Sequence, residues 1–276
     1  MDWNGLFGMV YGVLGGLFSF LPVSPEVHQE VFLRLAGLSA PGYGMSLAVH
    51  LGGLLAVIFS YYKQILRFAT ERKIAALPVR RRKRQPDAVC LMELKLLRLS
   101  AIALALFGVL APWLGRYFNR LWLLAIIAVL NAVLVYVPHY MPRANKDARS
   151  VTPLDALLVG FSGIVCMVPG FSAVGALTAV SSMRGQDREF GLRYTYLLMI
   201  PLLVCMCIGD LIMLIATSGG NLAAMLLPGI LACLGAFGAG IMGIRMMRFL
   251  SVKIGYESFA YYSLGLAMFT FVIYLI

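Results

Sequence analysis

The chain has 276 residues, of which 61% are hydrophobic and only 13% are charged, and its mean hydropathy is +0.87. A soluble domain cannot bury that much apolar surface, so the composition excludes a soluble globular protein. Because one membrane-crossing helix takes about 20 apolar residues, a chain of this length has room for roughly six to eight crossings in a single helical bundle.

The first apolar segment covers residues 5–38 and is interrupted near its middle by Pro22. Non-helical backbone at membrane depth persists only where protein or water satisfies it, so such breaks usually line a cavity. We predict a re-entrant helical hairpin here, which enters and leaves the membrane on one side. A basic n-region and a secretory cleavage site are both missing, so Met1 onward is expected to be retained.

Six further segments are long and apolar enough to cross a membrane. They cover residues 43–62, 97–115, 121–138, 190–217, 222–243 and 258–276. A second broken segment, residues 154–183, contains Pro169 and is also predicted to be a re-entrant hairpin. The two broken segments predict an inverted repeat, about 1–138 and 150–276, within one membrane domain, because matching breaks in two halves mark such folds. Chance similarity of two short apolar stretches is the alternative.

The distribution of basic residues predicts the orientation. Eleven of the 23 Lys and Arg lie between Lys63 and Arg98, five of them consecutively at residues 80–84. Since cytoplasmic loops are rich in Lys and Arg, we expect a cytoplasmic basic loop over 63–98, near anionic head groups. Nucleic-acid binding is the other interpretation of the net charge of +11, and the lack of interleaved aromatic residues argues against it.

With that loop inside, both chain ends are expected outside. Two further basic loops then lie inside, together with the basic residues after the second broken segment. These residues are Arg143, Lys146, Arg149, Arg184, Arg188, Arg193, Arg245, Arg248 and Lys253. The five cysteines are odd in number and mostly lie in apolar stretches, which indicates neither a disulfide framework nor a zinc site.

Two motifs carry a resemblance to a known family. Residues 15–28 read GGLFSFLPVSPEVH, and residues 169–176 read PGFSAVGA. They are similar to the E-G-x-T-E-F-L-P-V-S-S-T-G-H and P-G-x-S-R-S-G-A signatures of the bacterial undecaprenyl-diphosphate phosphatases of the bacitracin-resistance type. VHLG at 49–52 and TYLL at 195–198 add to the resemblance, which covers nearly the whole chain in the right order.

The resemblance implies a plasma-membrane enzyme that removes the terminal phosphate of undecaprenyl diphosphate at the outer side, which regenerates a carrier lipid for cell-wall synthesis. It also implies carboxylates that hold a divalent cation such as Mg²⁺ or handle protons, and an Arg that neutralises phosphate charge. The chain departs from the signatures at these groups. The two glutamates fall on Gly15 and Ser19, and the Arg falls on Ala173. Hydrolysis is therefore expected to be at least about a hundredfold below that of a complete relative.

Several polar residues of the motifs remain. His28, Glu26 and Ser24 are the candidate catalytic residues, with Glu26 as a displaced carboxylate. In the alternative interpretation, Glu26 is a solvated loop residue and His28 is a plain hydrogen-bonding group. Ser24 and Ser172 are predicted to bind phosphate through their hydroxyl groups.

Backbone and span residues complete the set of candidates. Gly170 and Gly175 are expected to bring backbone N–H groups close to the same phosphate. Asp210 lies inside an apolar span, where an ionisable residue is a functional candidate by default, although it also lies near enough to the outer end to reach water. His50 in another span is expected to pack or to hydrogen-bond to a neighbouring helix, with a ligand role as the alternative.

The sequence thus predicts an all-α polytopic membrane bundle that binds a polyprenyl phosphate or diphosphate lipid. Its activity is either hydrolysis of the diphosphate or, in the alternative, binding or translocation of the lipid without hydrolysis. No nucleic-acid partner is expected. The sequence leaves the metal requirement and the oligomeric state open, a homo-oligomer included.

Overall fold

The computed structural model describes residues 4–118, 120–141, 145–217, 222–253 and 255–276. It is 82% helical, and the described part of the chain forms no strand. The α-helices are α1 Gly5–Ser19, α2 Pro25–Ala36, α3 Tyr43–Ala76, α4 Ala88–Gly115, α5 Leu121–Tyr136, α6 Pro153–Ser162, α7 Ala173–Met183, α8 Arg188–Ala216, α9 Leu222–Lys253 and α10 Glu257–Leu275. Short 3₁₀ helices cover Val79–Arg81, Val137–Tyr140 and Gly163–Met167.

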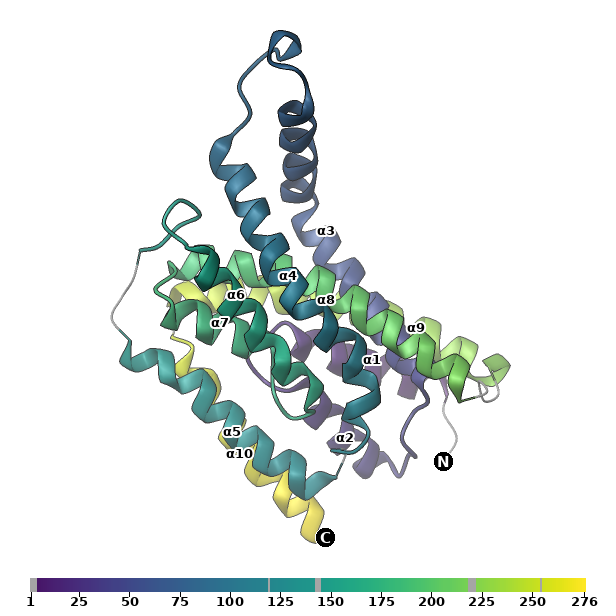
Figure 1. Cartoon of the computed structure of the whole chain (residues 1–276). Coiled ribbons are helices and arrows are strands. Elements are labelled where there is room, and N and C mark those ends of the chain that lie inside the picture. The colour runs from purple at the N-terminus through teal and green to yellow at the C-terminus, as the bar shows by residue number, and fades with distance from the viewer. Residues whose placement is uncertain (1–3, 119, 142–144, 218–221, 254) are drawn as a thin grey trace.

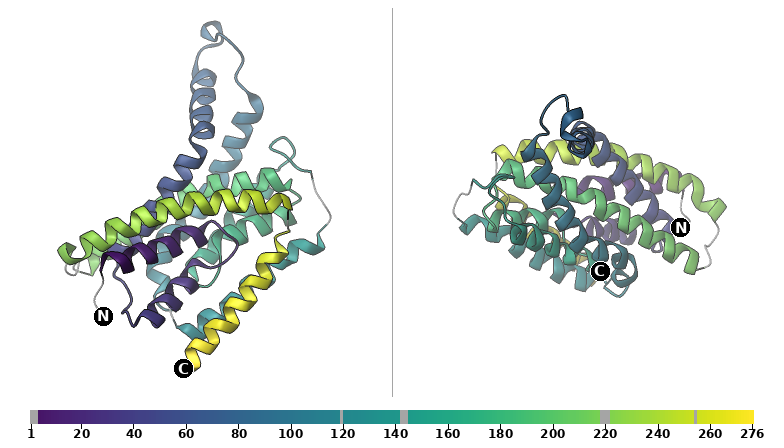
Figure 2. Two further views of the ribbon diagram at one scale, coloured as in Figure 1. Left: turned by 180° about the vertical axis from the view of Figure 1, so that it is seen from behind. Right: turned by 45° about the horizontal axis from the view of Figure 1, so that its top comes forward.

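Six helices are long and apolar enough to cross a membrane, as predicted: α3, α4, α5 with its 3₁₀ extension, α8, α9 and α10. The chain is therefore a polytopic all-α membrane protein. In Figure 1, α5 and α10 lie side by side along one edge of the bundle, and α3 and α4 project together from its top. The views in Figure 2 show the same projecting arm from behind and from above.

The basic segment expected as a loop over 63–98 is mostly helical. Helix α3 continues to Ala76 and α4 begins at Ala88, so only residues 77–87 connect them. At 1.5 Å per residue, the 34 residues of α3 extend over about 50 Å, well beyond a hydrocarbon core of about 30 Å. Buried Glu71 orders the connection, since it pairs with Arg84 at 2.5 Å and accepts the Asp87 N–H at 2.8 Å.

The loop expected after residue 243 is also helical. Arg245 and Arg248 lie within α9, which continues to Lys253. Of the other basic loop residues, Arg143 lies outside the described residues, whereas Lys146 and Arg149 lie in the segment before α6.

The two broken segments form helical hairpins whose tips meet. Helix α1, the first helix of one hairpin, packs parallel to α9, while α6, the first helix of the other, packs parallel to α4. Because α4 and α9 run in opposite directions, α1 and α6 do so too. Ser172 at the second tip donates its hydroxyl to the Leu21 carbonyl at 2.8 Å and its N–H to Asn131 Oδ1 at 2.9 Å. Asn131 in turn donates to the Pro22 carbonyl at 3.3 Å, so one buried amide ties both tips together.

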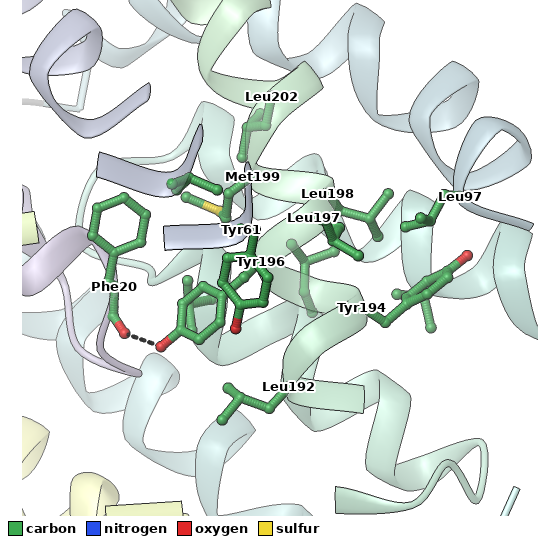
Figure 3. Close-up of a cluster of buried hydrophobic side chains, with 14 of the residues drawn as sticks. Phe20, Tyr61, Leu97, Leu192, Tyr194, Tyr196, Leu197, Leu198, Met199 and Leu202 are labelled. Atoms are coloured by element: carbon green, nitrogen blue, oxygen red, sulfur yellow. Dashed lines mark hydrogen bonds between the residues drawn. The ribbon is translucent and has the colours of Figure 1, made fainter. Parts of the chain in front are cut away.

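The main hydrophobic core surrounds the first tip. Tyr196, fully buried in α8, donates its hydroxyl to the Phe20 carbonyl at 2.8 Å, the dashed line in Figure 3. Around this bond pack Phe20 itself, Tyr61 from α3 and leucines of α8. The bond satisfies a carbonyl that the break in the hairpin leaves without a helical partner, and this lets non-helical backbone lie inside the core.

Close backbone contact joins the first hairpin to α9. A Cβ atom added at Gly8, Gly12 or Gly16 would lie 2.0–2.4 Å from a carbonyl oxygen of α9. Small residues four apart allow two membrane helices to approach this closely, which increases their van der Waals contact. The glycine spacing on α1 therefore fixes the position of the hairpin along α9.

Asp155 anchors the base of the second hairpin, outside the six long helices. Its buried carboxylate accepts hydrogen bonds from the Thr152 N–H, from Lys146 and from Arg184, which follows α7. Burial by itself would raise the pKa of Asp155, but these hydrogen bonds outweigh burial and lower the pKa to about 2. The carboxylate is therefore charged at neutral pH and holds the two ends of the hairpin together.

Candidate functional site

A cavity of about 500 Å³ opens next to the hairpin tips, at the end of the bundle away from the 77–87 loop. We call it the tip cavity. The N-terminal half of α3, the C-terminal ends of α4 and α8, and both hairpins contribute to its walls. Its ionisable residues are Tyr11, Glu26, Glu30, Tyr43, His50, Arg116, Cys166 and Asp210.

The three positions that lack the signature charges all line this cavity. Gly15 and Ser19 lie on α1, and Ala173 begins α7. Gln29 occupies the space beside Gly15, because a Cβ atom at residue 15 would lie 2.5 Å from its Nε2. The same amide donates to the Tyr11 carbonyl at 3.2 Å. A cavity thus lies where the resemblance places the site. Gln29 occupies part of the space that a larger side chain at position 15 would need.

Two carboxylates reach the tip cavity from α2. Glu26 lies in the first turn of this helix, and Glu30 follows one turn later on the same face. Ser24 is the N-cap of α2, accepting the Val27 N–H at 3.3 Å, and it donates its hydroxyl to Glu26 Oε2 at 2.9 Å. Glu26 is therefore a placed cavity carboxylate rather than a solvated loop residue.

His50 and Asp210 form an ion-pair-like contact across the cavity, from α3 to α8. His50 Nδ1 lies 2.6 Å from Asp210 Oδ2, and the Asp210 side chain is 1% exposed. A carboxylate only accepts hydrogen bonds at neutral pH, so Nδ1 is the donor, and Nε2 is an acceptor when the ring is neutral. Nε2 bonds to no described residue, and Glu26 lies close enough for its charge to act on the ring. The expected helix-to-helix hydrogen bond of His50 is confirmed.

One cation lies at the edge of the tip cavity. Arg116 follows the end of α4, is exposed, and donates to the Tyr117 hydroxyl at 2.8 Å. The Tyr117 ring lies 4.8 Å from its guanidinium carbon. This contact holds the guanidinium near the mouth, where it can meet the charge of an entering phosphate.

His28 lies outside the tip cavity. Its ring stacks on Phe18 with centroids 3.4 Å apart, and its nitrogens lie 2.6 Å from the Ser24 carbonyl and 2.8 Å from the Tyr262 hydroxyl of α10. The helix turns this side chain toward α10, while Glu26 and Glu30 face the cavity. The geometry thus favours the interpretation of His28 as a hydrogen-bonding group.

The four residues expected to bind phosphate have structural roles at the tips, and Ser172 among them bonds across from one tip to the other. The Ser172 hydroxyl both donates to Leu21 and accepts the Gly175 N–H at 3.0 Å. Gly170 has a φ of +105°, which favours glycine, and a Cβ atom there would meet Ile127 at 2.7 Å. Ser24, Ser172, Gly170 and Gly175 are all absent from the cavity wall, although chain neighbours of the first three line it.

Glu30, Gln29 and Arg116 were missed by the sequence interpretation. Glu30 had a signal, since it follows Glu26 by four residues and therefore shares its helical face. Arg116 had none, because a single Arg after an apolar span is ordinary. Within the described residues, three His, Cys, Asp or Glu side chains nowhere gather closely enough to hold a metal by themselves. Mg²⁺ commonly binds one or two carboxylates together with substrate phosphates, and Glu26 with Glu30 fits that pattern.

Comparison with known proteins gives matches along the whole chain. Residues 8–269 match the family model described as Bacitracin resistance protein BacA. An undecaprenyl-diphosphatase of Nocardioides sp. is 24% identical over 273 residues, which cover 97% of this chain and 96% of that protein. One of Acidothermus cellulolyticus is 27% identical over 274 residues, covering 96% and 95%. One of Micrococcus luteus is 28% identical over 203 residues, covering 73% and 71%.

Proposed function

Because the chain belongs to the bacitracin resistance protein BacA family, we propose that it hydrolyses the diphosphate of a polyprenyl diphosphate lipid, using a relocated set of charged residues. The observation that carries this proposal is the His50–Asp210 pair, which faces Glu26 across the tip cavity. The signature positions are substituted, yet the same cavity holds three carboxylates, a histidine and an arginine contributed by other residues.

In the proposed reaction, water attacks the terminal phosphorus. The bond between that phosphorus and the bridging oxygen breaks, and inorganic phosphate and polyprenyl monophosphate are the products. His50 Nε2 accepts the proton of the attacking water, while Asp210 holds the ring through Nδ1 and stabilises the imidazolium that forms. Arg116 neutralises phosphate charge at the mouth.

The two α2 carboxylates are the residues that would hold a divalent cation. Such a cation would polarise the phosphate oxygens and reduce their repulsion from Glu26 and Glu30. The Ser24 hydroxyl orients Glu26 by its hydrogen bond. In this proposal Ser24 is a positioning residue, not a nucleophile.

A second function, binding or translocation of a polyprenyl monophosphate without hydrolysis, has its own supporting observation. The cavity is lined at residues 15, 19 and 173 by Gly, Ser and Ala. These small side chains leave room in the cavity and add no charge to it. A monophosphate lipid carries less charge than a diphosphate, so it needs fewer cations at its site.

Phosphate release by the purified protein separates the two functions. Polyprenyl diphosphate is supplied with Mg²⁺, which is then chelated, and wild type is compared with His50→Asn, Asp210→Asn and Glu26→Gln. We expect each change to reduce turnover at least about a hundredfold, the usual worth of a positioned acid or base. His28→Asn, the matched histidine outside the cavity, should retain most activity. Full activity of His50→Asn, or its loss only in His28→Asn, would refute the proposed assignment.

We also propose that the protein is oriented in the bacterial plasma membrane with the tip cavity toward the outer side, the hairpins being re-entrant parts of two inverted repeats. The support is the basic 77–87 loop, which lies at the opposite end of the bundle from the cavity. A cysteine placed at Gln85 should react with an impermeant maleimide only after the cells are opened. Labelling in intact cells would reverse the orientation.

A further inference from the structure

A second and larger cavity lies at the other end of the bundle, nearer the 77–87 loop. Its volume is about 1080 Å³, and it shares no lining residue with the tip cavity. The start of α8, the last turns of α9 and the 3₁₀ helix after α5 surround it, with Tyr61 from α3. We call it the arginine cavity.

Positive charge dominates the arginine cavity. Four arginines line it, at positions 188, 193, 245 and 248, against two acidic residues, Asp187 and Glu189. Asp187 is already used, because it accepts the N–H groups of Glu189 and Phe190 as the N-cap of α8. Arg193 pairs with Glu93, but the other three arginines form no ion pair with any described residue. Four guanidinium groups thus line one space that has only two carboxylates, and three of the four form no ion pair with a described residue.

An unsatisfied buried amide points to a ligand in the same place. Gln186 lines the arginine cavity and is 4% exposed, yet neither its Nε2 nor its Oε1 has a hydrogen-bond partner among the described residues. Buried side-chain amides are rarely left unpaired, since each lost bond costs about 1–3 kcal/mol. Nε2 is a donor that a phosphate oxygen would satisfy, and Oε1 accepts from water or a ligand hydroxyl.

Aromatic and apolar side chains form another part of the wall, beside a few neutral polar ones. The ring of Tyr256 lies 5.3 Å from the Arg188 guanidinium carbon, which holds this arginine in place. Phe249, Met141 and Pro138 also line the space, and Phe249 is 57% exposed. A volume near 1000 Å³ exceeds the size of a single phosphate and suits a phosphate group that carries an organic chain.

We propose that the arginine cavity is a second phosphate-binding site, on the opposite end of the bundle from the hydrolytic site. The ligand is a phosphate or diphosphate group held by Arg245, Arg248 and the Gln186 amide, because arginine forks match phosphate oxygens in geometry and charge. The phosphate belongs either to a lipid, whose chain would lie along Phe249, or to a free soluble ion. This inference stands on the second cavity alone and does not need the tip cavity to be catalytic.

Binding to the purified protein in detergent tests the proposal. The probes are farnesyl monophosphate, farnesol as its uncharged match, and inorganic phosphate or diphosphate, measured by titration calorimetry. We expect farnesyl phosphate to bind and farnesol not to bind. The double variant Arg245→Gln/Arg248→Gln should weaken the binding at least tenfold. Gln186→Leu should weaken it to a smaller degree. If inorganic phosphate binds with the same affinity as farnesyl phosphate, the ligand is a free ion. If inorganic phosphate does not bind, the ligand is the lipid.

Two controls locate the effect. Arg80→Gln/Arg81→Gln removes the same charge from the exposed 77–87 loop and should leave affinity unchanged. All measurements are repeated in an Arg116→Gln background, which removes the arginine of the tip cavity and so separates the two sites. Equal binding of farnesol and farnesyl phosphate in that background, or equal affinity of the two double arginine variants, would overturn the proposal. Unfolding temperatures in detergent identify any variant that fails to fold, in which case Arg248→Lys replaces it.

Discussion

Restoring the first signature glutamate should destabilise the protein, because the space beside Gly15 is filled. A Cβ atom at residue 15 would lie 2.5 Å from Gln29 Nε2 and 2.6 Å from Val49 Cγ1. Overpacking of this kind costs about 1–3 kcal/mol, and displacing the Gln29 amide also removes its bond to Tyr11, worth about 1 kcal/mol. We therefore expect Gly15→Glu to lower the free energy of unfolding by about 2–4 kcal/mol.

Part of this loss should be recoverable. Gln29→Ala removes the nearer obstacle, so the double variant Gly15→Glu/Gln29→Ala should be more stable than Gly15→Glu by at least about 1 kcal/mol. Unfolding in detergent, followed by intrinsic fluorescence, measures both. Gly238→Ala in α9 is the matched control, since a Cβ atom there meets nothing within 4 Å. If Gly15→Glu unfolds like that control, the reasoning from the packing of residue 15 is wrong.

Three further outcomes are expected. Because the pKa of Asp155 is depressed, its contribution to stability is present above pH 4 and is lost as the pH falls through about 2. Asp155→Asn should therefore lower the free energy of unfolding by about 1–2 kcal/mol at pH 7, a range that allows for the partly exposed cationic partners. At pH 2 the loss should be nearly nothing, as acid titrations of unfolding would show. Gly12→Leu should separate α1 from α9 and lower the unfolding temperature by several degrees more than Gly238→Leu in a thermal scan. Tyr196→Phe should cost about 1–3 kcal/mol by leaving the Phe20 carbonyl unsatisfied, measured in the same unfolding assay.

The sequence predicted the membrane helices well, because some 20 apolar residues in a row leave little choice of structure. It predicted the C-terminal ends of α3 and α9 poorly. Residues 63–76 and 244–253 are rich in charge, yet they stay helical; in α3 the buried Glu71 pairs with Arg84 across the connection. Charge density marks where a helix leaves the apolar phase, not where it ends.

The motifs place their residues at the two hairpin tips beside the tip cavity, but partly other residues line that cavity. Glu26 lines the cavity, while His28, two residues later, points to Tyr262. Which face of α2 meets the cavity depends on its packing against α1 and α10, and no local pattern contains that information. The pairing of His50 with Asp210 joins residues 160 positions apart and likewise requires the assembled bundle.

The hydrogen-bond network at the hairpin tips constrains the order in which the chain folds during synthesis. Among the described residues, Asn131, Ser172 and Tyr196 satisfy the carbonyls of Pro22, Leu21 and Phe20 at the first tip, and Tyr196 follows Phe20 by 176 residues. At 5–20 residues per second, the ribosome needs roughly 10–35 s to reach it. For that time the nascent first hairpin carries unpaired carbonyl groups that hydrocarbon cannot solvate. We therefore expect the hairpin to take its final position only after α8 has been synthesised.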